Sequence, residues 1–84
     1  MELTTLRQFA VIAEVGHITR AAERLGVTQP ALSAMLKKLE AEVGAPLLDR
    51  TGRGVVPTAA GAAFLEHALA SIRHAEKALS LIHI

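Results

Sequence analysis

Residues 19–33 read Thr19-Arg-Ala-Ala-Glu-Arg-Leu-Gly-Val-Thr-Gln-Pro-Ala-Leu-Ser33, an order that fits two short crossed helices joined by a tight turn. Ala22 is small enough for the two helices to approach closely, and Gly26 can adopt the positive φ that a sharp turn needs. Thr28 can cap the next helix, and Leu32 would point back into the crevice between them. The pattern predicts a helix-turn-helix.

A further helix precedes this stretch. Its apolar residues recur at the i, i+3, i+4, i+7 spacing of one helical face, and they are Leu6, Phe9, Ala10 and Ala13. Thr4 or Thr5 can cap this helix, and Gly16 can end it. We expect the short second helix to take Thr19 as its N-cap and to stop at Gly26.

The third helix has clear boundaries. Thr28 begins it, Pro30 lies in its first turn where a missing N–H costs nothing, and Gly44 follows its end. The predicted buried face consists of Leu32, Met35, Leu36, Leu39 and Val43. At 100° per residue the opposite face presents Pro30, Ala34, Lys37 and Ala41, flanked by Ser33 and Lys38, with Gln29 at the N-terminal tip.

The C-terminal half predicts a hairpin and a long helix. Leu47–Arg50 and Val55–Val56 bracket the turn Thr51–Gly54, as in a small β-hairpin. Thr58 can cap the last helix. Apolar residues then alternate at spacings of three and four, as in a coiled-coil seam; they are Leu65, Ala68, Ile72, Ala75 and Leu79. Because such a helix has no other obvious surface on which to bury its seam, we expect Leu65, Ala68, Ile72 and Ala75 to pair two chains.

The composition favours packed helices in one small domain. Sixteen alanines and 12 leucines among 84 residues make one residue in three an aliphatic helix former. The chain has no cysteine, which excludes disulfides and cysteine-ligated zinc. The net charge of +1 is close to neutral, so a nucleic-acid surface would have to be a local basic patch. No apolar run reaches the ~20 residues of a membrane span and no secretory signal is visible, so we expect a cytoplasmic protein without membrane contact.

The outward face of the third helix fits a DNA major groove. Short side chains occupy its first turns, and cations follow. Gln29 can pair with adenine N6 and N7, Ser33 can donate or accept, and Ala34 offers a methyl group to thymine. Lys37 and Lys38 are better placed for phosphates.

From Leu3 to about Ala78 the chain resembles the DNA-binding domain of LysR-type transcriptional regulators. The residues that carry the resemblance are Leu6-Arg-Gln-Phe, Thr19-Arg-Ala-Ala-Glu-Arg-Leu, Thr28-Gln-Pro-Ala-Leu-Ser, Leu39-Glu, Gly44, Pro46-Leu-Leu, Arg50, and Thr58 with Ala60-Gly61. The resemblance implies a mostly α winged helix-turn-helix with a β-hairpin wing over residues 1–58. It also implies a linker helix over residues 59–84 that pairs two chains into a homodimer on double-stranded DNA.

The resemblance also implies roles for individual residues. Residues that match Gln29, Pro30 and Ser33 approach bases in that family, and the residue that matches Thr28 contacts phosphate. Wing residues that match Arg50 and Arg53 hold the backbone or the minor groove. This sequence departs from the family at Ala34 and Met35, where relatives often carry polar residues.

The last six residues, Leu79–Ile84, have a second interpretation. The codons CTG TCT CTT ATA CAC ATC encode the same six residues and look like the end sequence of a transposon adapter. The family resemblance also implies an effector-binding domain that this chain does not contain. We therefore expect a truncated gene product with residues 79–84 foreign, and a native helix end is the alternative.

Other functions receive less support. A protein-interaction module without DNA binding is the main alternative, but its third helix should present an apolar outward face. The histidines lack the i, i+4 spacing of a helical metal pair and are expected in solvent; they are His17, His67, His74 and His83. Ser33 and Ser71 have no convincing base or orienting residue. We expect no enzyme, no metal and no cofactor.

Overall fold

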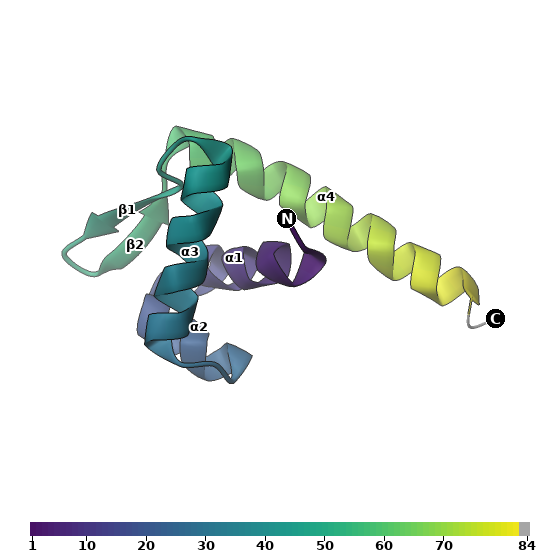
Figure 1. The fold of residues 1–84 in the computed structure, drawn as a ribbon, viewed down its shortest axis with the longest axis horizontal. Helices are drawn as coiled ribbons and strands as arrows, with labels where there is room; N and C mark the ends of the chain where they lie inside the picture. Colours follow the sequence, from purple (N-terminus) through teal and green to yellow (C-terminus); the bar gives the residue numbers. More distant parts are fainter. Residues whose placement is uncertain (83–84) are drawn as a thin grey trace.

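Over residues 1–82, which are the residues it describes, the computed structural model contains four helices and one two-stranded antiparallel sheet (Figure 1). The elements are α1 (Leu3–Val15), α2 (Ile18–Leu25), α3 (Gln29–Val43), β1 (Leu48–Thr51), β2 (Gly54–Pro57) and α4 (Ala59–Ile82). This order confirms the mostly α winged helix-turn-helix with a hairpin wing and a long C-terminal helix.

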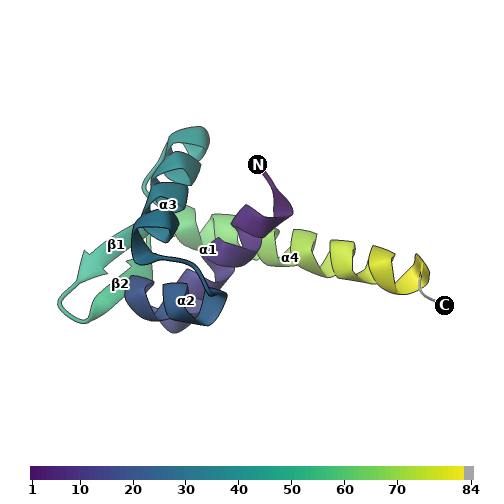
Figure 2. The ribbon, with the colours of Figure 1, turned by 60° about the horizontal axis from the view of Figure 1, so that its bottom comes forward.

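The first three helices form a small bundle from which the hairpin and α4 project. In both ribbon views the hairpin and the C-terminal end of α4 lie at opposite ends of the molecule (Figure 1, Figure 2). The extents of 47 × 26 × 20 Å reflect the length of α4. α4 packs on α1 and β2, and Glu76, far along α4, still forms an ion pair with Arg7 of α1 at 3.5 Å. None of the helices within residues 1–82 combines the length and apolar character needed to cross a membrane.

The turn between α2 and α3 forms as the sequence predicts. Gly26 has φ +70°, and its N–H donates to the carbonyls of Ala22 and Glu23. The Oγ1 atom of Thr28 accepts from the N–H of Ala31 at 3.2 Å, which caps α3. The two helices are therefore joined by only three residues, which fixes their crossing.

Two helices begin earlier than predicted. The N-cap of α1 is Glu2 rather than Thr4 or Thr5, and the N-cap of α2 is His17 rather than Thr19. For α2 the earlier start follows from burial. Ile18 packs in the core, and the helix begins at this residue, one position before Thr19. Hydrophobic packing outweighs the capping preference at this end.

The core consists of two adjoining clusters. The first lies between the helices and the wing and contains Ile12, Ile18, Ala21, Ala22, Leu32 and Val55. The second contains Phe9, Leu39 and Leu47, and the ring of Phe64 meets that of Phe9 edge-on with centroids 5.4 Å apart. One predicted core residue of α3 is misplaced: Val43 is 37% exposed, because the last turn of α3 extends beyond the second cluster.

The wing packs directly on the turn between α1 and α2. Its strands pair Leu48 with Pro57 and Thr51 with Gly54. The N–H of Val55 donates to the carbonyl of Gly16 at 3.0 Å. A Cβ atom at position 54 would lie 2.1 Å from the same carbonyl oxygen. The wing therefore approaches the bundle this closely only because residue 54 is glycine.

The prediction that residues 79–84 are foreign concerns a segment that the structure describes only in part. Residues Leu79–Ile82 continue α4, whereas His83 and Ile84 lie outside the described residues. The origin of residues 79–84 stays a prediction.

Candidate nucleic-acid interface

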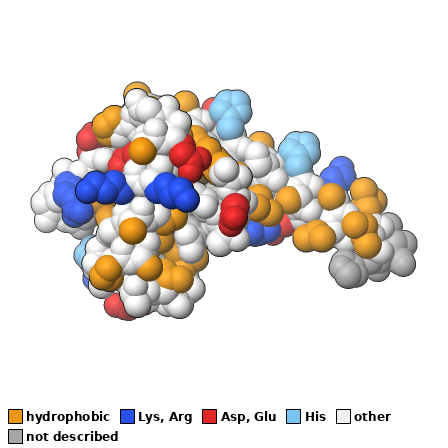
Figure 3. Space-filling view, viewed as in Figure 1, with side chains coloured by type: hydrophobic (Ala, Val, Ile, Leu, Met, Phe, Trp, Pro, Cys, Tyr) orange, Lys and Arg blue, Asp and Glu red, His pale blue; other side chains and the backbone are white. Residues whose placement is uncertain are grey.

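The sequence-predicted DNA-contact residues lie on α3, its N-cap and the wing. Those on α3 and its cap are Thr28, Gln29, Pro30, Ser33, Ala34, Lys37 and Lys38, and those on the wing are Arg50 and Arg53. All nine are exposed except Ser33, which is half-buried. Figure 3 shows Lys and Arg side chains in a row over the wing and α3. We call this surface the α3–wing face.

Strand alternation decides which way the wing cations point. Arg50 pairs with the buried Val55, whereas Asp49 pairs with the exposed Val56. Paired residues share one face of the sheet, so Arg50 lies on the side of the helices and Asp49 on the opposite side. The acid next to Arg50 in the sequence therefore does not neutralise it.

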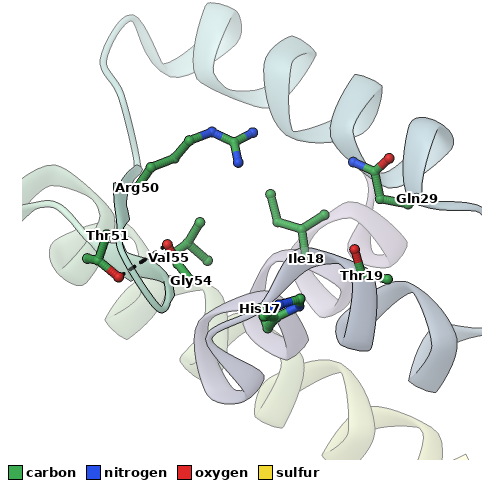
Figure 4. Close-up of a pocket in the computed structure, with 8 residues that line it drawn as sticks. All are labelled: His17, Ile18, Thr19, Gln29, Arg50, Thr51, Gly54 and Val55. Carbon is green, nitrogen blue, oxygen red and sulfur yellow. Dashed lines mark hydrogen bonds between the residues drawn. The ribbon is translucent and has the colours of Figure 1, made fainter.

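Arg50 lines two cavities that lie between the wing and α3. One cavity of about 190 Å³ is lined by Arg50 together with Gln29, Thr19 and His17 (Figure 4). A second, of about 260 Å³, is lined by Arg50 together with Ser33 and other residues. The same guanidinium thus reaches the surroundings of both polar residues in the first turns of α3.

The cations of this face are not paired with acids. The ion pairs within residues 1–82 join the Met1 amino group to Glu42, Arg7 to Glu76, and Arg24 to Glu14. None of them involves Lys37, Lys38, Arg50 or Arg53. Four of the nine Lys and Arg residues thus lie on one face without an ion pair, and the other cations without one within residues 1–82 are Arg20, Arg73 and Lys77.

Glu40 anchors the wing to α3, a role that the sequence analysis missed. One carboxylate oxygen accepts from the N–H of Leu47 at 2.6 Å and from the N–H of Leu48 at 3.4 Å. The bond holds the start of β1 against the last turn of α3. A signal was present, because an acid in the last turn of a helix opposes the helix dipole and needs another partner.

Two residues of the cavity beside Arg50 also escaped prediction. His17 was expected in solvent, but it is half-buried, and its Nδ1 atom is buried without a hydrogen-bond partner within the described residues. The cause is its place at the start of α2, against the wing. Thr19, one residue into α2, is exposed and faces the same cavity (Figure 4). His67 and His74 are exposed as predicted, and His83 lies outside the described residues.

The predicted dimerisation residues divide into two groups. Ala68 is only 3% exposed, so it is not available to a second chain. Leu65 is half-buried and packs on the cluster around Phe9. The expectation that the seam of α4 has no other surface is therefore wrong for this part of the helix, because α1 covers it. Ile72 and Ala75, farther along, are half-buried.

An apolar groove of about 410 Å³ runs beside the covered part of the seam. Its walls come from both helices, and the lining residues are Ala10, Val11, Ala13, Glu14, Leu65 and Leu69. Leu69 is 40% exposed there and was not among the predicted contacts. We call this surface the α1–α4 face.

The sequence matches the family described as "Bacterial regulatory helix-turn-helix protein, lysR family" over residues 3–62. The chain belongs to this family. Among curated LysR-family relatives, the HTH-type transcriptional regulator BudR of Klebsiella aerogenes is 49% identical over 79 residues, which are 94% of this chain and 55% of that protein. The Hca operon transcriptional activator HcaR of Escherichia coli (strain K12) is 50% identical over 78 residues, which are 93% of this chain and 26% of that protein. The chain thus spans about half of the first relative and about a quarter of the second.

Solved LysR-family structures have the same fold. The protein chain of the CbnR_DBD-DNA complex superposes with a TM-score of 0.92 at 40% identity, over 99% of this chain and 95% of that one. The chain of the BenM_DBD/benA site 1 DNA complex superposes with a TM-score of 0.93 at 35% identity, over 99% of this chain and 93% of that one.

Proposed function

We propose that this chain binds double-stranded DNA sequence-specifically and thereby regulates transcription, with the α3–wing face as its contact surface. The observation that carries this proposal is the set of four cations on that face without an acidic partner in the described chain. Similar solved chains were crystallised with DNA, which supports it. Action on a bacterial chromosome would take place in the cytoplasm.

The side chains on this face divide by reach and charge. Gln29, Pro30, Ser33 and Ala34 occupy the first turns of α3 and are assigned to base edges in the major groove. Thr28, Lys37 and Lys38 are assigned to phosphates. Arg50 and Arg53 are assigned to the backbone or the minor groove beside the wing. In this proposal residues 1–58 contact DNA, and residues 59–84 link and dimerise.

Dimerisation through the α1–α4 face is the second part of the proposal. Leu69 leaves 40% of its surface exposed at the edge of an apolar groove, and Ile72 and Ala75 continue the apolar side of α4. A second copy would cover the groove with the same residues, as two-fold symmetry requires. A dimer would also present two copies of α3 to two half-sites.

The alternative, a protein-interaction module without DNA binding, fits the surface less well. Such a module needs an apolar contact patch. The α3–wing face instead carries short, polar and basic side chains, whereas the apolar groove lies on the α1–α4 face.

The salt dependence of duplex binding tests the proposal. Fluorescence anisotropy with a labelled duplex, measured between 50 and 200 mM salt, should give a linear fall of log K with log salt, because phosphate contacts release counterions. A duplex selected from a random-sequence library should bind about 10³-fold or more tighter than a random duplex. Failure to bind any duplex even at the lowest salt would refute the proposal.

A further inference from the structure

Two of the proposed base-contact side chains are hydrogen-bonded to each other. The Nε2 atom of Gln29 donates to the Oγ atom of Ser33 at 2.5 Å. The two residues are four apart on α3, so their side chains lie one above the other on the same helical face. The bond therefore runs along the surface that is proposed to enter the major groove.

The two partners differ in how firmly the chain holds them. Gln29 is exposed in the first turn of α3, where a long side chain has several accessible rotamers. Ser33 is half-buried in the hollow that it shares with Ile18 and Leu36. The short, half-buried side chain of Ser33 is thus the less mobile partner of the bond, and the long amide side chain of Gln29 is the more mobile one.

The bond also orients the amide of Gln29, because it places Nε2 rather than Oε1 next to Ser33. A glutamine amide carries two N–H donors on Nε2 and an acceptor on Oε1. One N–H of Gln29 is used by Ser33, which leaves the other N–H and the Oε1 oxygen for a ligand. An adenine presents the complementary N7 acceptor and N6 donor in the major groove. The hydroxyl proton of Ser33 is left free for an acceptor on a neighbouring base or a phosphate.

We propose that Ser33 is a positioning residue for Gln29 and that the two side chains read DNA as one unit, with adenine as the base opposite Gln29. This inference rests on the proposed function. Ser33 holds the amide in its reading orientation before DNA arrives, so less side-chain freedom is lost on binding. Removing the hydroxyl of Ser33 should therefore weaken the preference of Gln29 for adenine.

A double-mutant cycle on the 84-residue chain tests this unit. The wild type first selects its duplex from a random library. Gln29→Ala then identifies the base position at which preference is lost, and all four bases are placed there. Ser33→Ala should reduce the preference for adenine at that position by about 2- to 10-fold, the worth of one hydrogen bond, although Gln29 is still present. In the Gln29→Ala background, Ser33→Ala should have no further effect on that preference.

Two more variants separate positioning from general damage. Ser33→Thr keeps the hydroxyl and should keep the adenine preference. Lys37→Ala, one turn along the same face, should weaken binding to every duplex and leave the preference unchanged. Circular dichroism should give similar unfolding midpoints for all variants.

Three outcomes would overturn the inference, and they are distinguishable. If Ser33→Ala weakens binding but leaves the adenine preference intact, then Ser33 and Gln29 act independently. The same holds if the effects of the two substitutions on that preference are additive. If Gln29→Ala changes no base preference while the wild type still selects a duplex, then Gln29 reads no base and the unit is refuted alone. If the wild type selects no duplex, the proposed function fails as well.

Discussion

The α3–wing face and the α1–α4 face are both helix surfaces, but they differ in what the chain itself already covers. The outward residues of α3 are exposed, and their cations have no acidic partner in the described chain. On α4, by contrast, Ala68 is buried against the same chain while Leu69 next to it is 40% exposed. The side of α4 that carries Ala68 is therefore covered by the chain itself, whereas the adjacent side that carries Leu69 is left partly open.

The difference follows from side-chain size. An alanine on α4 lets α1 approach closely, and the core around Phe9 and Phe64 extends along the contact. Lys37 and Lys38 on α3 have long charged side chains, which would be costly to bury without a partner of opposite charge. These side chains therefore stay exposed, and we propose that their partner is a ligand that supplies negative charge.

The largest effect should come from a charge placed inside the α1–α4 contact. Ala68→Asp would bury a carboxylate without a partner, and we expect a loss of about 3–5 kcal/mol in the free energy of unfolding, measured by urea denaturation. Ile72→Asp, one turn farther along, should keep the fold but sediment as a monomer. If Ala68→Asp is as stable as the wild type, Ala68 does not lie in a packed contact within the chain. If Ile72→Asp remains dimeric, the interface lies elsewhere.

A smaller effect is expected where α3 holds the wing. Glu40→Ala removes a charged acceptor from the N–H groups of Leu47 and Leu48, and should cost about 1.5–3 kcal/mol of stability. Duplex affinity should fall as well, because the wing is no longer fixed against α3. Glu42→Ala is the matched control, since Glu42 is exposed and makes only a 3.9 Å ion pair, worth less than about 1 kcal/mol. Equal losses for the two variants would contradict the anchoring role.

The approach of the wing to the bundle gives the next prediction. Gly54→Ala should destabilise the chain by about 1–3 kcal/mol, because residue 54 has a φ of +151° and faces the Gly16 carbonyl. Gly52→Ala, in the same turn, should have little effect because an added Cβ meets nothing within 4 Å. Thermal unfolding of both variants measures the contrast. A stable Gly54→Ala chain would show that the wing can move away from the bundle without cost.

The smallest effects should come from single cations on the α3–wing face. Lys37→Ala and Arg53→Ala should each reduce the log–log salt slope of duplex binding by about 1, because each neutralises about one phosphate. Lys77→Ala on the exposed side of α4 should leave the slope unchanged. Anisotropy titrations over a salt series measure all three slopes. If the slope is the same for Lys37→Ala and for Lys77→Ala, then Lys37 stays in solvent.

The parts of the fold that could be predicted were those with short-range signals. Gly26 and Thr28 determine the turn between α2 and α3 within a few residues, and Thr58 caps α4 through its bond to the N–H of Gly61. The outward positions of α3 follow from helical periodicity alone. Such features need no knowledge of distant parts of the chain.

The missed features depend on contacts between distant residues. Glu40 meets Leu47 only after the chain turns back at Gly44, and α4 packs on α1, which lies far away in the sequence. The start of α2 at Ile18 is set by burial and not by the Thr19 cap signal. Periodicity predicts which face of a helix is apolar, but it does not say whether the same chain or a second one covers it.

The most direct test of the central claim compares charge reversal on the two surfaces. The double variant Lys37→Glu/Arg53→Glu is measured by anisotropy against the duplex that the wild type selects, with a control pair on the exposed side of α4, Arg73→Glu/Lys77→Glu, that changes the net charge equally. We predict that the double variant loses detectable duplex binding with an unchanged unfolding midpoint, whereas the control pair binds like the wild type. Wild-type affinity in the double variant would contradict the assignment of the α3–wing face as the DNA-binding surface.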